Sequence, residues 1–485
     1  MSKLTRRNFL QGTLAAAATV TIAGTKSSGR VLGSNDTIRV AVAGLNGRGS
    51  SHVDEFARMK NVELVYLIDP DTRTYAGRLK QIDKLGGKKP KTVQDVRKAL
   101  EDKDVDVVSI ATPNHWHSLM TIWACQAGKD VYVEKPCSHN VHEGRIAVEV
   151  ARKLGRIVQH GTQSRTEGGR VHVVEAIRSG QLGKLLVSRA LCYKDGGKGH
   201  NTRGNIGFKP ATKPPAELDF NLWLGPAKDQ PYHANLVHYR WHWFWDFGNG
   251  DLGNQGVHEM DVARWGIAGA TLPRSAFCIG GRFVGPKEKD QGQTANTQVA
   301  VLDFDGVPLI FEVRGLPSKD YKGQRVGNIF HLEAGTIAGT KFFPKDSDKP
   351  APLPKVKGER GPGQRHFENF IAAVRSRKQS DLNADILEGH YSSALCHLAN
   401  ISYRLGKEVP CEPRPKGVDD KNTLEALERM EEHLKENGYK LDATSVRVGP
   451  LLKVDAKTER VLDNDDANRL LTRNYRKPFV VPERL

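Results

Sequence analysis

Long hydrophobic runs are missing from most of this sequence, which is the first constraint on its function. After a short apolar stretch near the N-terminus (residues 14–23), no run approaches the roughly 18 residues that a membrane-spanning helix needs. We therefore expect no stable membrane insertion of the folded chain.

Cysteine is also scarce. The six residues are irregularly spaced, with no Cys-x-x-Cys pair and no Cys/His cluster. Zinc-binding spacings are therefore absent, and we expect no metal site. In an oxidising compartment these side chains could form disulfides, and buried free thiols would fit the pattern equally well.

A dense basic run is a third absence. The chain carries 73 Lys and Arg against 56 Asp and Glu, a net charge of +17, but the basic residues are scattered and are not interleaved with aromatics. Dispersed positive charge is typical of a solvated surface, so we expect no nucleic-acid partner. At 485 residues without repeats or low-complexity tracts, the chain should form about two domains with extensions.

The N-terminus has the pattern of an export signal. Arg6 and Arg7 precede the short apolar stretch, and the first acidic residue is Asp36. An ordinary basic N-terminus before a helix is the alternative. We interpret residues 1–34 as a twin-arginine signal peptide and linker, which implies the twin-arginine export machinery as a partner and a periplasmic or otherwise exported location. This route carries folded proteins, so it also suggests a tightly bound cofactor.

The segment after the signal has the layout of a dinucleotide-binding unit. Residues 37–43 are β-branched and predict a strand, a glycine-rich turn and a helix follow, and a second buried strand (62–68) ends at Asp69. Such a turn lets backbone amides approach a pyrophosphate, and the acid accepts the ribose hydroxyls, which favours NAD over NADP. Asn46 replaces the second glycine of the pattern and can tolerate a left-handed backbone. The expected cofactor contacts are Gly44, Asn46, Gly47, Arg48, Gly49 and Asp69.

Alternation of strands and helices continues to about residue 165. We expect helices near 93–100 and 116–127, strands at 105–111 and 130–133, and a further helix and strand within 141–159. This order predicts a doubly wound parallel sheet in a Rossmann domain over residues 35–165. Because ligands gather beyond the carboxyl ends of such strands, Asn114, His117, Gln163 and Arg165 are candidate ligand contacts.

Several segments resemble the glucose–fructose oxidoreductase, inositol dehydrogenase and MocA (Gfo/Idh/MocA) family, in an exported branch with a twin-arginine signal. They are Ala111-Thr112-Pro113-Asn114-His115-Trp116-His117, Gly128 to Pro136 with its Glu-Lys-Pro element, Trp223-Leu224-Gly225-Pro226, and Trp245 to Gly250 followed by His258 and Asp261. The resemblance covers about residues 37–410.

The resemblance implies a second α/β domain with a large, open, mainly antiparallel sheet, here residues 166–411, and a substrate between the domains. It implies that Lys135 contacts both cofactor and substrate and that Thr112, Pro113 and Glu134 contact the cofactor. An ammonium group there could stabilise a developing alkoxide. It also implies a homodimer or homotetramer formed through the exposed sheet face.

The family's Asp-x-x-x-His element corresponds to Asn254 and His258. The spacing of four would place both side chains on one helical face. Histidine suits removal of a proton from a substrate hydroxyl. Asn254 keeps hydrogen bonding but removes the charge, and Asp251 or Asp261 could take its place; a purely structural histidine is the alternative.

The segment 238–246 is dense in aromatics, which fits either a platform for sugar rings or an ordinary buried strand. On the first interpretation Trp241 and Trp245 contact substrate, as do Arg165, Tyr193 and Asp251. Strands are expected at 185–191, 275–284, 297–304, 308–313 and 328–333, and helices at 259–266, 366–376 and 386–404. Residues 412–485, with a charged helix at 422–437, form an extension of unassigned role.

Three functions remain open from the sequence. The first is an NAD-dependent oxidoreductase that transfers hydride between a sugar or polyol carbon and a tightly bound cofactor. The second is redox-neutral, NAD-dependent cleavage of a glycoside by transient oxidation, elimination and re-reduction. The third is a cofactor-binding protein without catalysis.

Overall fold

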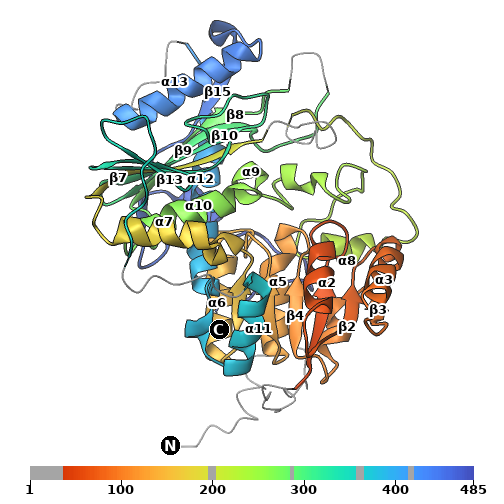
Figure 1. Cartoon of the computed structure of the whole chain (residues 1–485). Helices are drawn as coiled ribbons and strands as arrows, with labels where there is room; N and C mark the ends of the chain where they lie inside the picture. The colour runs from red at the N-terminus through yellow and green to blue at the C-terminus, as the bar shows by residue number, and fades with distance from the viewer. Residues whose placement is uncertain (1–35, 195–203, 285–288, 357–364, 413–419, 485) are drawn as a thin grey trace, which may run out of the picture.

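The computed structural model describes residues 36–194, 204–284, 289–356, 365–412 and 420–484. The predicted signal peptide and linker (1–34) lie outside these ranges. Two sheets organise the molecule, a parallel sheet in the lower half of Figure 1 and a larger sheet in the upper half, with α7 (Gly168–Arg178), α9 (Gly250–Gly253) and α10 (Gly256–Gly266) between them. The α/β class expected from the sequence is confirmed.

The parallel sheet has the strand order β3-β2-β1-β4-β5-β6, and every neighbouring pair within it is parallel. Its order reverses at β1, where a doubly wound sheet opens a crevice for ligands. The strands are β1 (Ile38–Ala43), β2 (Val62–Ile68), β3 (Lys91–Val93), β4 (Val107–Ile110), β5 (Asp130–Val133) and β6 (Val158–His160). The helices are α2 (Gly49–Ala57), α3 (Tyr75–Lys84), α4 (Val96–Leu100), α5 (Asn114–Gln126) and α6 (Val141–Lys153). The sequence analysis predicted five of these strands but anticipated neither β3 nor α3.

The central strands of this sheet, β1, β4 and β5, are buried on both faces, which explains their mainly hydrophobic sequences. One face packs against α5 and α6, and the other against α2 and α11 (His366–Ser376). Phe367, Phe370 and Val374 of α11 enter the core beside Ile38 and Val40, although they lie within the range predicted for the second domain. The proposed boundaries at residues 165 and 411 remain predictions.

The larger sheet has the order β13-β12-β11-β7-β10-β9-β8-β15-β14, with β16 and β17 attached at β8. It is mainly antiparallel, and β7 with β10 is a parallel pair. Its strands are β7 (Leu185–Tyr193), β8 (Ser275–Gly281), β9 (Thr297–Phe304), β10 (Val307–Arg314), β11 (Val326–Leu332), β12 (Gly335–Ala338), β13 (Lys341–Pro344), β14 (Lys407–Pro410), β15 (Ser445–Val448), β16 (Leu452–Asp455) and β17 (Arg460–Val461). The remaining α-helices are α8 (Phe220–Leu224), α12 (Ile386–Leu405), α13 (Lys421–Glu436) and α14 (Asp465–Leu470).

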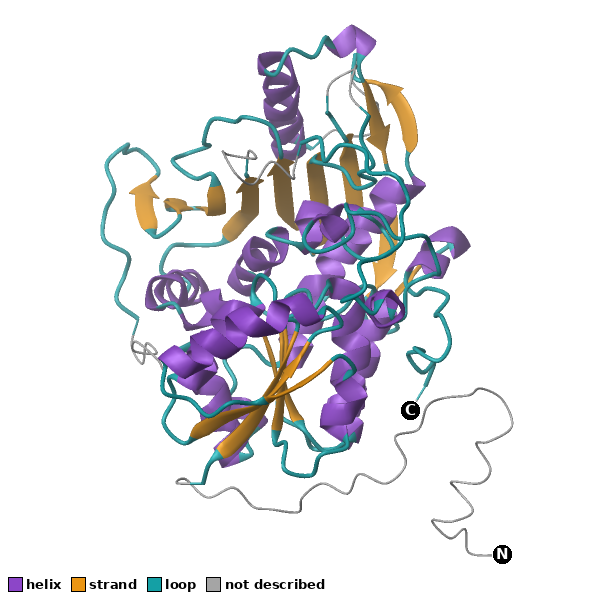
Figure 2. Cartoon of the chain, turned by 90° about the vertical axis from the view of Figure 1, so that its right-hand side faces the viewer, coloured by secondary structure: helices purple, strands orange, loops and turns teal. Residues whose placement is uncertain are grey.

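Both faces of the larger sheet are covered where they are described. Helices α10 and α12 pack on the inner face, and α13 lies across the outer one, as the top of Figure 2 shows. Apolar residues of α13, Ala426, Leu427 and Met430, contact the sheet, and its Arg429 pairs with buried Glu312 of β10 at 2.5 Å. This is the face on which we expected a second subunit. The predicted dimer or tetramer would therefore need a surface other than the part beneath α13.

The segment after α14 runs back to the parallel sheet. Phe479 and Val481 belong to the same core cluster as Trp116 and Trp123 of α5. Arg476 donates to the backbone oxygen of Gly225 at 3.0 Å. The C-terminal extension thus contacts both halves of the molecule. Within the described residues, no helix is long and apolar enough to cross a membrane.

Candidate active site

A cavity of about 320 Å³ opens at the carboxyl ends of β1, β2, β4 and β5. One wall comes from the parallel sheet and the other from residues 222–258 of the second half. Most of the residues predicted for the site line it: Gly44, Asn46, Gly47, Arg48, Asp69, Thr112, Pro113, Asn114, His117, Glu134, Lys135, Gln163, Trp241, Asn254 and His258.

The turn between β1 and α2 is held by close backbone contacts that only glycine permits. Gly44 has φ +83°, and a Cβ there would lie 2.5 Å from the carbonyl of Ala111. A Cβ on Gly49, which is not in the cavity wall, would lie 1.8 Å from the oxygen of Gly44. A Cβ on Gly47, in contrast, would meet no protein atom within 4 Å. Asn46 does not adopt a positive φ, so the left-handed tolerance that we considered for it is not used.

These features fit a dinucleotide. The tight turn brings backbone and the start of α2 to the cavity, where a pyrophosphate can be bound without side chains in the way. At the end of β2, Asp69 accepts hydrogen bonds from the backbone amides of Leu45 and Asp71 at 2.8 and 2.9 Å. Burial raises the pKa of Asp69 to about 6, against those two hydrogen bonds, which favour its ionised form. Its position and chemistry suit the ribose hydroxyls.

The Glu-Lys-Pro element follows β5 and places two opposite charges side by side. Glu134 accepts from Arg48 Nε at 2.7 Å, and His52 Nε2 lies 3.1 Å from the same oxygen. Burial alone would raise the pKa of Glu134, but Arg48, His52 and Lys135 hold it well below its usual range. Glu134 is therefore a buried anion that secures the glycine turn to β5.

Lys135 reaches across the cavity to the second half of the molecule. Its Nζ donates to the backbone oxygen of Asn254 at 2.9 Å and to Asn254 Oδ1 at 3.1 Å. Burial lowers the pKa of Lys135, while Glu134 acts in the opposite direction. The Lys135 ammonium group is thus fixed between the parallel-sheet wall of the cavity and the facing wall.

Asn254 and His258 do not share a helix, contrary to the expectation from their spacing. Asn254 follows α9 with φ −98° and ψ −92°, and α10 begins only at Gly256. The break turns the backbone so that both residues still line the cavity. Burial, with a contribution from Lys135, lowers the pKa of His258 to about 3. The imidazole is therefore neutral at physiological pH and can accept a proton.

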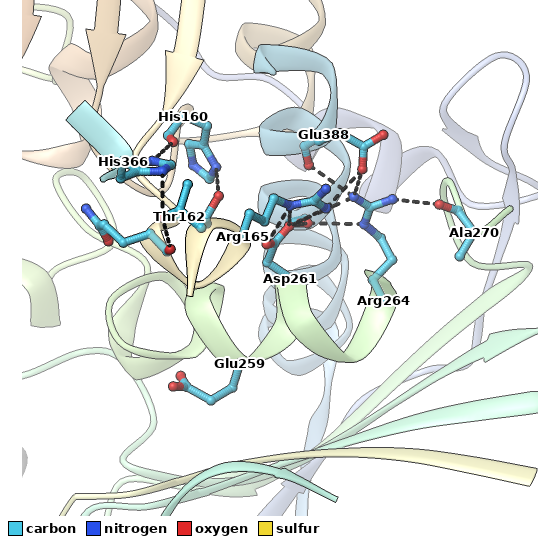
Figure 3. A network of polar contacts seen from close by, with 12 residues as sticks. His160, Thr162, Arg165, Glu259, Asp261, Arg264, Ala270, His366 and Glu388 are labelled. Carbon is cyan, nitrogen blue, oxygen red and sulfur yellow. Dashed lines mark hydrogen bonds and ion pairs between the residues drawn. The ribbon is translucent and has the colours of Figure 1, made fainter. Parts of the chain in front are cut away.

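Besides Gly49, four predicted residues lie away from the cavity wall. Arg165, in the 3₁₀ helix η2 (Gln163–Thr166), pairs with Asp261 of α10 at 2.8 Å and with Glu388 of α12 at 3.0 Å. Figure 3 shows this network, which Arg264 joins from α10. Arg165 and Asp261 therefore connect the two halves and are not free to contact a substrate.

The other three predicted residues, Tyr193, Asp251 and Trp245, also lie outside the wall of this cavity. Tyr193 is buried in the larger sheet and donates to Glu312 at 2.7 Å. Asp251 is fully buried in α9. Trp245 lies against Arg404 beside a different cavity. For both Trp245 and Tyr193, the sequence pattern gave no information on which way the side chain points.

The aromatic segment is neither a strand nor a single platform. Residues Arg240–Trp243 form the 3₁₀ helix η3. Trp241, Trp243, Phe244 and Phe247 belong to one hydrophobic core. Trp241 and His242, whose stacked rings have centroids 3.6 Å apart, also line the cavity. The strand interpretation is therefore wrong, and contact of Trp241 with a sugar ring stays a prediction.

Residues that the sequence analysis missed form a cover over the cofactor end of the cavity. Leu222, Trp223, His238 and Tyr239 line it there. Three contacts hold this cover on the parallel-sheet side: Thr72 N to Glu217 O at 3.1 Å, Asp219 N to Pro70 O at 2.9 Å, and His238 Nε2 to Asp71 at 2.8 Å. Across the described residues, no group of three or more His, Cys, Asp and Glu side chains is arranged to hold a metal ion.

Fold and site together define an NAD-binding Rossmann domain joined to a second α/β domain. Residues 38–162 match the domain described as oxidoreductase family, NAD-binding Rossmann fold, and residues 177–271 match that family's C-terminal alpha/beta domain. The chain thus matches both domains of the Gfo/Idh/MocA oxidoreductase family.

Similar proteins agree with this assignment. A protein named glycosyl hydrolase family 109 protein 2 from Shewanella sp. (strain ANA-3) is 30% identical over 213 residues, which are 39% of this chain and 46% of that protein. The chain thus spans about half the length of the curated relatives it matches. The solved WlbA dehydrogenase from Bordetella pertussis in complex with NADH and UDP-GlcNAcA has a TM-score of 0.53 at 18% identity, over 75% of this chain and 96% of that one. A levoglucosan dehydrogenase in complex with NADH and levoglucosan also has a TM-score of 0.53, at 16% identity over 75% and 96%. At these identities the two structures support the fold.

Proposed function

We propose that this protein is an NAD-dependent oxidoreductase acting on a secondary hydroxyl of a sugar, polyol or glycoside. The observation that carries the proposal is the meeting of Lys135, Asn254 and His258 beside the cofactor turn in one cavity. Bound NAD would supply the hydride acceptor. A C–H bond and an O–H bond of the substrate break, and a C=O bond forms.

The chain's own residues handle the proton and the developing charge. His258 is the group placed to accept the hydroxyl proton, since burial keeps its imidazole unprotonated at physiological pH. The Lys135 ammonium stabilises the negative charge that develops on the substrate oxygen. Asn254 holds Lys135 through two oxygens and so fixes where that charge can form. Trp241 supplies an aromatic face in the cavity for a sugar ring.

A second candidate is redox-neutral cleavage of a glycoside. The names of the relatives from Shewanella favour it, as does Asn254, which departs from the family's aspartate. Oxidation of one hydroxyl would acidify the neighbouring C–H, loss of that proton would expel the glycosidic oxygen, water would add to the double bond, and re-reduction would restore the hydroxyl. The net reaction consumes only water.

Two further parts of the proposal concern the cofactor and the location. The cover formed by Leu222, Trp223, His238 and Tyr239 supports slow release of NAD. The paired arginines at residues 6 and 7 support export by the twin-arginine route. A cofactor that is loaded before export and retained afterwards would fit both the slow release of NAD and the export of a folded protein. Replacing both arginines by lysine should leave the protein in the cytoplasmic fraction, whereas unchanged export would contradict this route.

The deciding experiment is an absorbance spectrum of the purified, undialysed protein before and after addition of candidate sugars and glycosides. Lasting reduction of the bound nicotinamide, reversed by a second carbonyl compound, would establish the oxidoreductase. Consumption of a glycoside without lasting reduction would establish the redox-neutral reaction. Failure of every sugar and glycoside to do either would leave a cofactor-binding protein without catalysis.

A further inference from the structure

A second cavity, of about 430 Å³, lies on the other side of Asn249 from the candidate active site. Asn249 separates the two: it accepts a hydrogen bond from Asn114 of the first cavity at 3.1 Å and donates to the backbone oxygen of His139 at 3.0 Å. The walls of this second cavity come from four places in the chain: residues 139–140 after β5, residues 245–249, the end of α12, and residues 469–474. None of the functions considered above uses it.

The charge in this cavity is strongly one-sided. Arg404, Arg469 and Arg473 line it, and the acidic residue in its wall is Asp246. Arg469 is paired outside with Asp466. Arg473 has an ion pair with Asp246 at 3.9 Å. Among the described residues, Arg404 makes no ion pair, and its guanidinium lies 5.1 Å from the ring centre of Trp245.

Two histidines add buried ring nitrogens without partners. Arg473 can only donate, and it donates to His139 Nδ1 at 3.2 Å, so that nitrogen accepts. Burial and the Arg473 charge hold the pKa of His139 well below its usual range, so the ring is neutral and its proton lies on Nε2. This buried Nε2 has no hydrogen-bond partner among the described residues, and neither has Nδ1 of His397, whose side chain is 3% exposed.

We propose that this second cavity binds a small organic oxyanion, a carboxylate or phosphate whose compact body stacks on Trp245 between Arg404 and Arg473. Guanidinium groups match the geometry of such oxygens, and a neutral imidazole N–H adds a donor. An unpaired buried donor is unfavourable, and an oxyanion would satisfy it. The Trp245 ring, already beside Arg404, offers the apolar contact.

The proposal is tested by calorimetric titration of the full, NAD-loaded protein at constant ionic strength. Inorganic phosphate and D-glucuronate are the anionic probes, and D-glucose is the neutral counterpart of glucuronate. We expect saturable binding of at least one anion. Binding of phosphate alone would identify a phosphate site, and binding of glucuronate alone a carboxylate site. Loading with NAD keeps phosphate away from the glycine turn.

Variants assign the binding to this cavity. Arg404→Gln should lower the affinity for the anion about tenfold or more. Arg404→Lys keeps the charge but loses the planar guanidinium, so its affinity should lie between those of Arg404→Gln and the unaltered protein. Arg274→Gln removes an exposed guanidinium of similar charge, paired with Asp305 and outside the cavity, and should change nothing. Absence of saturable binding of both probes, or equal binding by Arg404→Gln and the unaltered protein, would overturn the proposal. Binding lost in Lys135→Met but kept in Arg404→Gln would also overturn it, because it would lie in the active-site cavity.

Discussion

The two walls of the active-site cavity are built in different ways. The wall from the parallel sheet presents backbone, held by contacts as close as those of Gly44 and Gly49, and its charges are fixed by Glu134 and Asp69. The facing wall presents side chains from a segment with little regular structure, including Trp241, Asn254 and His258. The difference suggests a division of work: the first wall accepts one cofactor, and the second can change with the substrate.

The link between the walls is Lys135, and its removal should have the largest effect. Lys135→Met keeps the length of the side chain but removes the charge and both hydrogen bonds to Asn254. We expect turnover to fall about a thousandfold with NAD still bound, because charge stabilisation at the reacting oxygen is lost. Steady-state kinetics measure the turnover, and the cofactor content of the purified variant measures whether NAD is still bound. Full turnover in Lys135→Met would show that the walls act independently.

Gly44→Ala tests whether the first wall depends on its backbone. The Cβ would overlap the Ala111 carbonyl in a left-handed backbone that itself costs about 1–2 kcal/mol for alanine. We expect NAD affinity to fall about a hundredfold. The control is Gly77→Ala in α3, where a Cβ meets nothing within 4 Å.

Gly47→Ala separates two reasons for such a loss. Its Cβ would meet no protein atom, so reduced NAD affinity there would report close approach of the cofactor itself. If Gly44→Ala bound NAD normally, the backbone account of this wall would be wrong.

Asn254→Asp should adjust the second wall without destroying it. The new carboxylate would lie near Lys135 and His258 and would raise the pKa of the histidine, which burial now holds at about 3. A base works when it is unprotonated, so kcat/KM falls as pH drops through its pKa. We expect this acid limb to move up by about one to two pH units, so that a two-unit shift slows turnover roughly tenfold near pH 4 and leaves it almost unchanged at neutral pH. An unchanged pH profile would remove His258 from the role of base.

His238→Leu tests the cover and should have the smallest effect. It removes the contact with Asp71 that holds the cover over the cofactor end. We expect NAD to dissociate about fivefold faster, in line with one charge-assisted hydrogen bond at a partly exposed site. Arg73→Gln removes the other partner of Asp71 without touching the cover and serves as the control. Equal rates in His238→Leu and the unaltered protein would contradict a retaining role for the cover.

The same contrast explains what the sequence could predict. The first wall follows from local patterns, because buried strands, a glycine turn and the residue after each strand place their side chains at one sheet edge. Asp69 was found this way, whereas Lys135 at the same edge was identified through the family resemblance. The second wall depends on contacts between distant segments. Asn254 and His258 were identified through the family resemblance, but the helix break between them was not.

His238 and Tyr239 had no signal except their place in an aromatic segment. Arg165 and Tyr193 sit at the strand ends that ordinarily attract ligands, yet distant partners, Asp261 and Glu312, take up their polar groups. Only the folded chain brings those partners together, so periodicity and spacing carry no trace of them.

The position of Phe479 and Val481 has a consequence for biosynthesis. These side chains complete the core around Trp116 and Trp123, and nearby His142 lies 3.2 Å from the oxygen of Pro482, 340 residues later in the chain. A ribosome that has made the whole Rossmann sheet has therefore not yet supplied the residues that cover one side of it. Until residues 479–481 have been made, the core around Trp116 and Trp123 lacks the side chains that complete it.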